Sequence, residues 1–503
     1  MKAAFITLCA ALVLAGCARP ADPNTVVMLI ESSPTNLDPR VGTDAQSERI
    51  YELIFDALLR RDDNFNLKPG LAETWENPDP LTYIFHLRRG VRFHDGRSLT
   101  SRDVKWTFDS LLNGSIRTPK AGTYRAVAGL DAPDANTVVF HLKQPYVSLL
   151  WNLSEGAVGI VPYGSGAEIS RQPVGSGPFR FVSQEQDKEV VLERNPEYWG
   201  GLSTIERVRF AVVPDDTTRI LELRKGSADV AMNAFTADAV ETIRKQGELE
   251  VQQAPGTIYS YIAMNLRDPI LQDVRVRQAL AYAIDRDSLI KYLWRNEVRA
   301  AGSILPPQHW AHTDDGNYPF DPAKARALLD HAGYRPGKDG IRFHLVMKTS
   351  TEGSTRLLSA VLQQQLRQVG IALDIKSFEA ATFMADVTKG EFQIYSLRWV
   401  GGNEDPDIFD LLFNSARTPP KGANRGYYHN PRVDALIAQG LAETDQEKRK
   451  QTYAELQKVL ATDLPYINLW FFDNVLVHSK RLADVELSPS GDYNFLKDAH
   501  LKR

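Results

Sequence analysis

The chain has 503 residues, a formal net charge of -4 at pH 7 and only two cysteines. This length predicts two or three domains, and a core of that size is stable without disulfides. A weakly acidic chain lacks the charge pattern of a nucleic-acid-binding protein and the basic patch of a protein that binds lipid surfaces, so we expect no nucleic-acid partner. No apolar run after the N-terminal one reaches about 18 residues, which argues against a membrane-spanning helix.

The N-terminus has the pattern of an exported lipoprotein. Lys2 precedes a short apolar run that ends in small residues and a cysteine at 14–17 (LAGC). This pattern predicts a signal peptide over residues 1–16, a lipid-carrying Cys17 and a tether over residues 17–24. The alternative is a soluble secreted protein in which Cys17 follows the cut by chance.

Cleavage would have two further consequences. It would remove Cys9, so the mature chain would have no disulfide, and it would remove Lys2, so the net charge would become -5. We therefore expect an exported protein of the periplasm or cell envelope, anchored to the membrane by lipid. Ala18 follows the cysteine in place of the aspartate expected for inner-membrane retention, which leaves open which membrane holds the anchor.

The first half of the chain mixes strands and helices. Period-two runs predict strands, apolar residues at helical spacing predict helices, and Thr100 with Asp103 predicts a capping box. In chain order we expect a strand over 25–30, a helix over 47–59, two strands within 82–93, a helix after Thr100 and a strand over 137–142. The order is that of an α+β arrangement rather than a regular βαβ alternation.

The second half has its own organisation. Its pattern predicts helices after Asp273 and Asp287, a helix from Asp321 to Gly333, a helix over 357–369, a strand over 371–375, a helix over 453–460 and a strand-like tail over 466–477. The change from helix to strand at Gly370 is typical of a crossover unit, so this half is predicted to form a separate α/β lobe. The tail would return the chain to the first lobe.

Motifs of catalysis do not stand out. The turn at 175–179 (GSGPF) lacks the lysine and the helix entry that a phosphate loop requires. His309 and His312 lie in a proline-rich stretch that would not aim both rings at one metal. We therefore expect no catalytic residues, no enzyme activity, no cofactor and no metal.

The segment after the predicted strand 392–397 is the strongest candidate for ligand binding. Trp399 offers an aromatic face and one N–H donor, and Gly401 and Gly402 expose backbone N–H groups beside Asn403. We favour a pocket position for Trp399. For Asp405 the favoured interpretation is a cap of the following helix.

Seven segments together resemble the family 5 extracellular solute-binding proteins, which are peptide, oligopeptide and nickel-type receptors of ABC importers. These segments are 52–58 (ELIFDAL), 69–75 (PGLAETW), 83–91 (YIFHLRRGV), 93–96 (FHDG), 175–179 (GSGPF), 194–199 (RNPEYW) and 274–286 (VRVRQALAYAIDR). The resemblance implies a mixed α/β, two-lobed periplasmic-binding-protein fold with an extra subdomain in the first lobe and a hinge of two crossings.

The implied domains are lobe I over 25–262 with an inserted subdomain at about 58–168, lobe II over 263–472 and a return to lobe I over 473–503. The implied function is capture of a peptide-like ligand by a monomer that delivers it to the permease subunits of an ABC importer. A non-peptide solute such as an oligosaccharide, haem or chelated nickel, and a signalling or chaperone-like protein without a transporter, are the alternatives.

Two departures from dipeptide-binding relatives affect the expected ligand. The aspartate that holds the ligand's amino terminus in those relatives is replaced by Gly402, and no arginine lies at 348–350, where Lys348 and Thr349 stand instead. A zwitterionic dipeptide is therefore disfavoured, unless Asp405 takes over the role of the aspartate. Longer, modified or cyclic peptides stay possible.

Two further predictions come from the same comparison with relatives. Arg398 would contact an anionic or carbonyl-rich ligand, or else form an ion pair with Glu404 or Asp405. Thr43, Asp44 and Ala45 match a segment that borders the ligand in oligopeptide-binding relatives.

Overall fold

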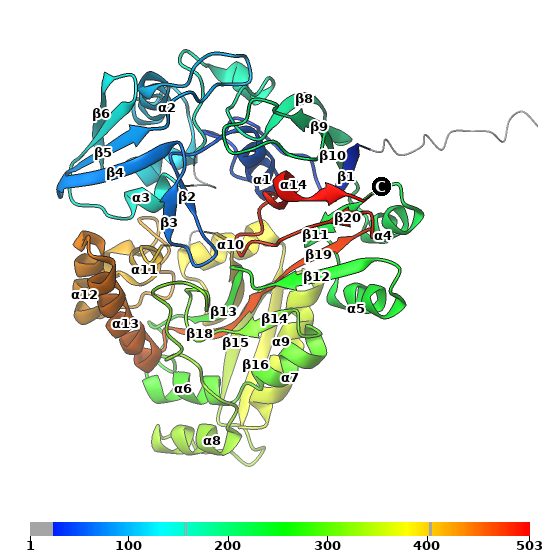
Figure 1. The fold of residues 1–503 in the computed structure, drawn as a ribbon. Coiled ribbons are helices and arrows are strands. Elements are labelled where there is room, and N and C mark those ends of the chain that lie inside the picture. The colour runs from blue at the N-terminus through cyan, green and yellow to red at the C-terminus, as the bar shows by residue number, and fades with distance from the viewer. Residues whose placement is uncertain (1–23, 155, 157, 402–404, 503) are drawn as a thin grey trace, which may run out of the picture.

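The computed structural model describes residues 24–154, 156, 158–401 and 405–502 (Figure 1). The predicted signal peptide, Cys17, Gly402 and Asn403 lie outside the described residues. Among the described residues, no helix is long and apolar enough to cross a membrane.

A seven-stranded mixed sheet forms the first of three main sheets. Its strand order is β12 (Glu250–Ala254), β19 (Asn474–His478), β11 (Val230–Met232), β1 (Thr25–Ile30), β10 (Arg207–Val212), β9 (Glu189–Arg194) and β8 (Phe179–Glu185). β1 runs parallel to both of its neighbours. The helices of this part are α1 (Ala45–Ile54), α4 (Asp216–Lys225), α5 (Ala237–Gln246) and α14 (Phe495–Asp498). Two short strands, β20 (Leu482–Ala483) and β21 (His500–Leu501), pair antiparallel in a small sheet of their own.

A four-stranded antiparallel sheet lies beside it, at the upper left of Figure 1. Its order is β4 (Ala72–Asp79), β5 (Thr82–Leu87), β7 (Thr137–Leu142) and β6 (Val127–Asp134), accompanied by α2 (Ser101–Leu112), α3 (Leu149–Asn152) and the hairpin β2 (Leu59–Arg61) to β3 (Leu67–Pro69). The predicted capping box opens α2, because the Thr100 N–H donates to Asp103 Oδ2 at 2.7 Å.

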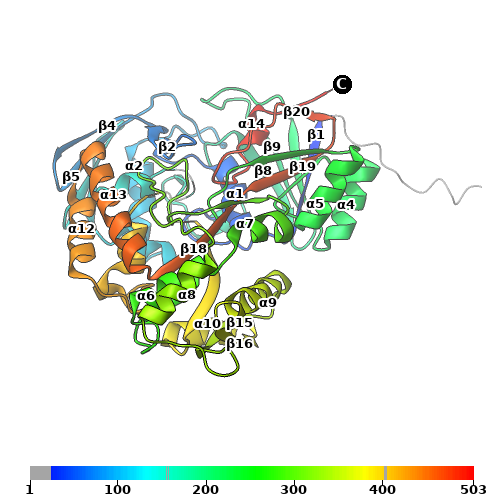
Figure 2. The same cartoon turned by 90° about the horizontal axis from the view of Figure 1, so that it is seen from below.

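A six-stranded sheet forms the lower half of the molecule. Its order is β14 (Val298–Ala300), β18 (Tyr466–Phe472), β13 (Tyr259–Met264), β17 (Ile394–Trp399), β15 (Phe343–Ser350) and β16 (Ile371–Phe378). Its helices are α6 (Val274–Tyr282), α7 (Arg286–Ser288), α8 (Pro322–His331), α9 (Gly353–Arg367), α10 (Ala380–Lys389), α11 (Ile408–Phe413), α12 (Pro431–Ala442) and α13 (Gln446–Asp463). Figure 2 shows α12 and α13 together on one flank and α9 and α10 beside β15 and β16.

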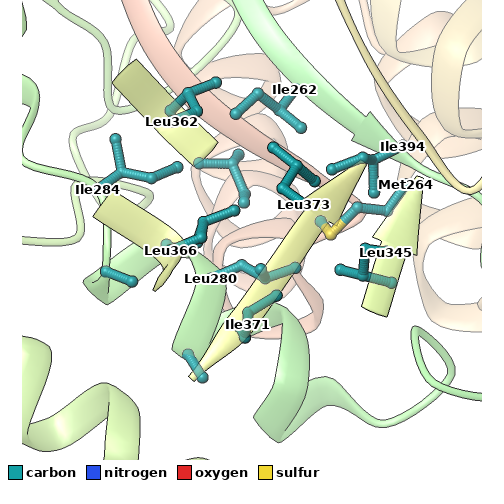
Figure 3. Close-up of a cluster of buried hydrophobic side chains, with 14 of the residues drawn as sticks. Ile262, Met264, Leu280, Ile284, Leu345, Leu362, Leu366, Ile371, Leu373 and Ile394 are labelled. Carbon is teal, nitrogen blue, oxygen red and sulfur yellow. The ribbon is translucent and has the colours of Figure 1, made fainter. Parts of the chain in front are cut away.

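The core of this half rests on the predicted crossover. β15 and β16 are parallel and α9 connects them, as the pattern around Gly370 indicates. Leu362 and Leu366 of α9 pack with Leu373 of β16 and Ile262 of β13, all fully or almost fully buried (Figure 3). Each buried aliphatic side chain of this kind stabilises the fold by about 1.5–3 kcal/mol.

Four predicted elements differ from the structure. Of the two strands predicted within 82–93 only β5 is present, because the chain turns after Leu87 and residues 88–93 contribute no more than an isolated bridge from Arg92 to Ser98. The helix predicted over 47–59 ends at Ile54, and Leu59 begins β2, because Phe55 takes an extended conformation. The helix predicted after Asp287 is instead a short α7 capped by Asp285 and followed by a π turn. The tail predicted as one run over 466–477 is two strands, β18 and β19, separated at Asp473 and paired in different sheets.

The chain passes between the seven-stranded and six-stranded sheets at two places. β12 leads into β13 through residues 255–258, and β18 leads into β19 at Asp473. We refer to the seven-stranded and four-stranded sheets with their helices as the first lobe. The six-stranded sheet with its helices is the second lobe.

Candidate functional site

A cleft lies between the two lobes and consists of two adjoining cavities. The hinge-side cavity, of about 550 Å³, includes Thr257, Ile258 and Asn474 at the two crossings. The outer cavity, of about 610 Å³, includes Tyr146 of the first lobe and residues of α11 and α12. Both cavities are lined by Pro119, Thr123, Asn152 and Trp399. Each has the size of a pocket for a small organic ligand.

Trp399 stands at the centre of this cleft. It is the last residue of β17 and pairs with Tyr259 of β13, which holds its backbone in the sheet on that side. The side chain is half-buried, and its Nε1–H is shielded from water without a hydrogen-bond partner among the described residues. A buried donor of this kind favours a ligand acceptor, since unpaired buried donors are costly.

The turn after Trp399 also faces the cleft. Val400 is 68% exposed and lines the hinge-side cavity with Gly401. Gly401 has a φ of 69°, a left-handed conformation that glycine adopts without strain. The predicted contacts of Gly402 and Asn403 fall outside the described residues.

The first lobe contributes the start of α1 to the opposite wall. Thr43 and Ala45 line the hinge-side cavity. Asp44 has a different position, because its carboxylate accepts the Ser47 N–H at 2.9 Å and caps α1. The cap fixes the end of the helix that presents its two neighbours to the cleft.

Arg398 lines neither cavity. Successive side chains of a strand point to opposite faces, so Arg398 points away from the face of Trp399. Its guanidinium donates to Ser354 Oγ at 2.8 Å, lies 4.0 Å from Glu352 Oε2 and stacks over the Phe472 ring at 4.5 Å. Burial lowers the pKa of Arg398. Its carboxylate neighbour among the described residues is therefore Glu352, and not Asp405.

Lys348, Thr349 and Asp405 also lie away from both cavities. Lys348 Nζ contacts Asp386 Oδ2 at 2.6 Å, and Thr349 is fully buried within β15. Asp405 is 5% exposed and forms a bidentate ion pair with Arg449, with both N–O distances at 3.1 Å. The Asp405 carboxylate also accepts the Asp407 N–H at 3.0 Å, beside the start of α11.

The structure adds charged residues that the sequence did not indicate. Glu48 and Glu52 of α1, Arg61, Lys120 and Asp492 all line the hinge-side cavity. Lys120 Nζ donates to Tyr51 Oη at 2.7 Å and to the Pro39 carbonyl at 3.0 Å, and burial lowers its pKa to about 8. The i, i+4 spacing of the two glutamates is a local signal, whereas Arg61 ends β2, Lys120 lies in a short 3-10 helix and Asp492 follows β20.

Comparisons with known proteins agree with this arrangement. Over residues 66–419 the sequence matches the family described as bacterial extracellular solute-binding proteins, family 5 Middle. The chain is 30% identical to the probable di/tripeptide-binding protein 5 of Pseudomonas aeruginosa (strain UCBPP-PA14), with 99% of both chains covered. It is 30% identical to the glutathione-binding protein GsiB of Pectobacterium atrosepticum, with 94% of both covered.

The fold has close counterparts among solved structures. HbpA2 from Haemophilus parasuis superposes with a TM-score of 0.85 and 25% identity, covering 95% of this chain and 100% of that one. The mixed α/β architecture is thus that of the two-lobed periplasmic binding proteins. Sequence match, fold and inter-lobe cleft lead to one conclusion: the chain belongs to the family 5 bacterial extracellular solute-binding proteins.

Proposed function

We propose that the protein captures a peptide-like solute between its two lobes and delivers it to the permease of an ABC importer. The observation that carries this proposal is Trp399, which lines both cavities of the cleft and whose buried N–H has no partner within residues 24–154, 156, 158–401 and 405–502. A peptide supplies carbonyl oxygens for such a donor and flat amide groups for the indole face. Relatives named for di- and tripeptides and for glutathione support the same ligand class.

The proposed ligand contacts are a subset of the residues predicted from the sequence. Thr43, Ala45, Trp399 and Gly401 line the hinge-side cavity and are proposed to touch the ligand. Gly402 and Asn403 belong to the same proposal through their place in the sequence. We assign Arg398, Lys348, Thr349 and Asp405 to structural roles, because their side chains are buried or engaged within the second lobe.

The remaining features of the proposal concern the setting of this cleft. We propose a monomeric receptor, without catalysis, cofactor or metal, that is exported and lipid-anchored at Cys17. Sheet membership supports a division into lobes at residues 255–258 and at Asp473, which moves the first boundary from 262 to the segment before β13. Replacing Cys17 with serine tests the anchor: the protein should move from the membrane fraction to the soluble fraction.

Isothermal titration of the mature protein with di- to pentapeptides and with glutathione tests the ligand class. Trp399→Phe keeps the aromatic face but loses the N–H donor, so affinity should fall about fivefold, the effect of one hydrogen bond. Trp399→Ala loses the face as well and should weaken binding at least about tenfold.

Trp294→Phe is the matched control. Trp294 is also half-buried with an unpaired Nε1–H, but it lines neither cavity. Its replacement should leave affinity unchanged. Failure of every peptide to bind, or equal affinities for Trp399→Ala and the parent protein, would contradict the proposal, and mass spectrometry of a co-purified ligand would then identify a non-peptide solute.

A further inference from the structure

The two lobes also touch each other directly, beside the outer cavity. Tyr146 Oη of the first lobe donates to Asp407 Oδ2 at 2.9 Å, and Ser148 Oγ donates to Asp405 Oδ1 at 2.6 Å. The Val147 N–H points to the Leu441 carbonyl at 3.4 Å. In Figure 1 this contact lies on the left, between α3 and the α11 to α13 group, away from the crossings at β12 and β19.

The second lobe presents a ready-made ion pair at this contact. Arg449 and Asp405 both belong to the second lobe, and their side chains are 1% and 6% exposed. Arg449 Nε also donates to the Gly440 carbonyl at 2.9 Å. Its guanidinium lies 5.5 Å from the ring centroid of Trp310 of the same lobe and 5.0 Å from that of Trp151 of the first lobe.

The division of groups between the lobes has a physical consequence. The charged groups of this contact are already paired within the second lobe, while the first lobe adds neutral groups: two hydroxyls and an aromatic ring. When the lobes separate, the ion pair meets water intact, so no buried charge is left without its partner. Separation therefore breaks the aromatic contact and hydrogen bonds whose first-lobe partner is a neutral hydroxyl, including the bond from Arg449 Nη2 to Ser148 Oγ at 3.3 Å.

We propose that Tyr146 and Ser148, docked on Asp407 and Asp405, form a reversible latch that favours the closed cleft before any ligand is bound. The proposal rests on the proposed function in one respect, since the latch controls access to the same cleft. The two residues act as positioning residues: they set the ratio of open to closed protein and need not touch the ligand. A ligand's apparent affinity then depends on that ratio.

Asp407 links the latch to pH. Burial and the neighbouring charge of Asp405 raise the pKa of Asp407 above its usual range, and the groups that face it are Tyr146, Arg449 and Asp410. Asp407 therefore keeps its proton up to a higher pH in the closed form than in the open form, where the carboxyl is more exposed. Closure is favoured at acid pH and weakens as the pH rises from the ordinary pKa of an aspartate towards the raised pKa of Asp407 in the closed form, by at most tenfold per pH unit.

Spin labels on the two lobes would measure the latch without any ligand. Exposed positions Leu81 of the first lobe and Lys338 of the second can be replaced by cysteine in the full mature chain with Cys17→Ser. Pulsed electron paramagnetic resonance then gives the populations of short and long inter-lobe distances. Tyr146→Phe and Ser148→Ala should each raise the open to closed ratio about fivefold, as expected for one hydrogen bond.

Asp407→Asn tests the hydrogen bond and the titration separately, because it keeps the acceptor oxygen but removes the group that titrates. Its amide oxygen still accepts from Tyr146, so closure at pH 7 should persist while the change in populations between pH 6 and 9 disappears. Tyr163→Phe, a half-exposed tyrosine of the same lobe outside the latch, should change nothing. Unchanged distance distributions in both Tyr146→Phe and Ser148→Ala would overturn the latch, whereas a failure to find a peptide ligand would overturn only the proposed function.

Discussion

Arg277 of α6 offers a sharp test of how the second lobe is held together. Its side chain is buried, and its guanidinium donates to the carbonyls of Leu271 at 2.7 Å, Gln272 at 2.9 Å, Asp463 at 2.9 Å and Leu464 at 3.2 Å. It thereby connects the loop before α6 to the C-terminal end of α13, where carbonyls have no partner within the helix.

The expected effect of Arg277→Met follows from these contacts. Each hydrogen bond to a charged donor stabilises by about 1.5–3 kcal/mol, and four carbonyls would lose theirs. Part of this loss is offset, because burying the guanidinium also disfavours the native state and lowers the pKa of Arg277. We expect a net loss of about 3–5 kcal/mol in the free energy of unfolding, at least about a hundredfold in the folded to unfolded ratio.

Urea unfolding followed by tryptophan fluorescence measures this loss, since Trp294 and Trp470 lie in the same lobe. At a slope of about 3 kcal/mol per molar urea, the midpoint should fall by about 1 M or more. The urea midpoint of Arg277→Lys should lie between those of the parent protein and Arg277→Met, because one ammonium group cannot reach four carbonyls.

Gln278→Met is the control for Arg277→Met. It removes a half-buried neighbour that donates to the Thr462 carbonyl at 3.1 Å and hydrogen-bonds Tyr318, both near the surface, and should change stability by less than about 1 kcal/mol. If Arg277→Met and Gln278→Met unfold within about 1 kcal/mol of each other, the four-carbonyl account is wrong.

Other parts of the fold give further predictions. Gly175→Ala should lower stability by about 2–3 kcal/mol in thermal unfolding, because the added Cβ would lie 2.0 Å from the Ile54 carbonyl oxygen. Gly122→Ala is the control and should be neutral, because its Cβ would have no atom within 4 Å. Equal melting temperatures of the two variants would refute this prediction. Burial lowers the pKa of His94 to about 4, so stability should fall as the pH drops from about 6.5 towards 4, and His94→Gln should abolish that dependence in urea titrations. Because the pKa of Lys120 is lowered to about 8, stability should rise between pH 8 and 10; Lys120→Met should remove the rise, and a persistent rise would assign it to another group.

Local patterns allowed much of the fold to be predicted. The crossover of β15, α9 and β16 follows from a change of period at Gly370, and the start of α2 follows from a capping box, both signals within a few residues of the element. The division of 466–477 into β18 and β19 has no such signal. Asp473 is a single polar residue within an apolar run. That the segments before and after it pair with different sheets is a property of the tertiary structure.

The candidate site divides in the same way. Trp399 could be placed in the cleft because it ends a strand beside a glycine turn, and strand alternation alone sends Arg398 to the other face. The charged wall of the hinge-side cavity could not be predicted. Glu48, Lys120 and Asp492 lie far apart in the sequence and converge on the hinge-side cavity only in the tertiary structure.

The strength of a contact in this protein follows from whether it must break during function. Within the second lobe, Arg277 and Arg449 hold buried carbonyls and a carboxylate with charged hydrogen bonds, which are expensive to disrupt. Across the cleft, Tyr146 and Ser148 are neutral hydroxyls that each donate one hydrogen bond to a carboxyl group, so less is lost there than at the four carbonyls held by Arg277. Because a ligand shifts the lobes only by its differential affinity for the closed form, a contact of the weaker kind can bias closure without making release of the ligand too slow.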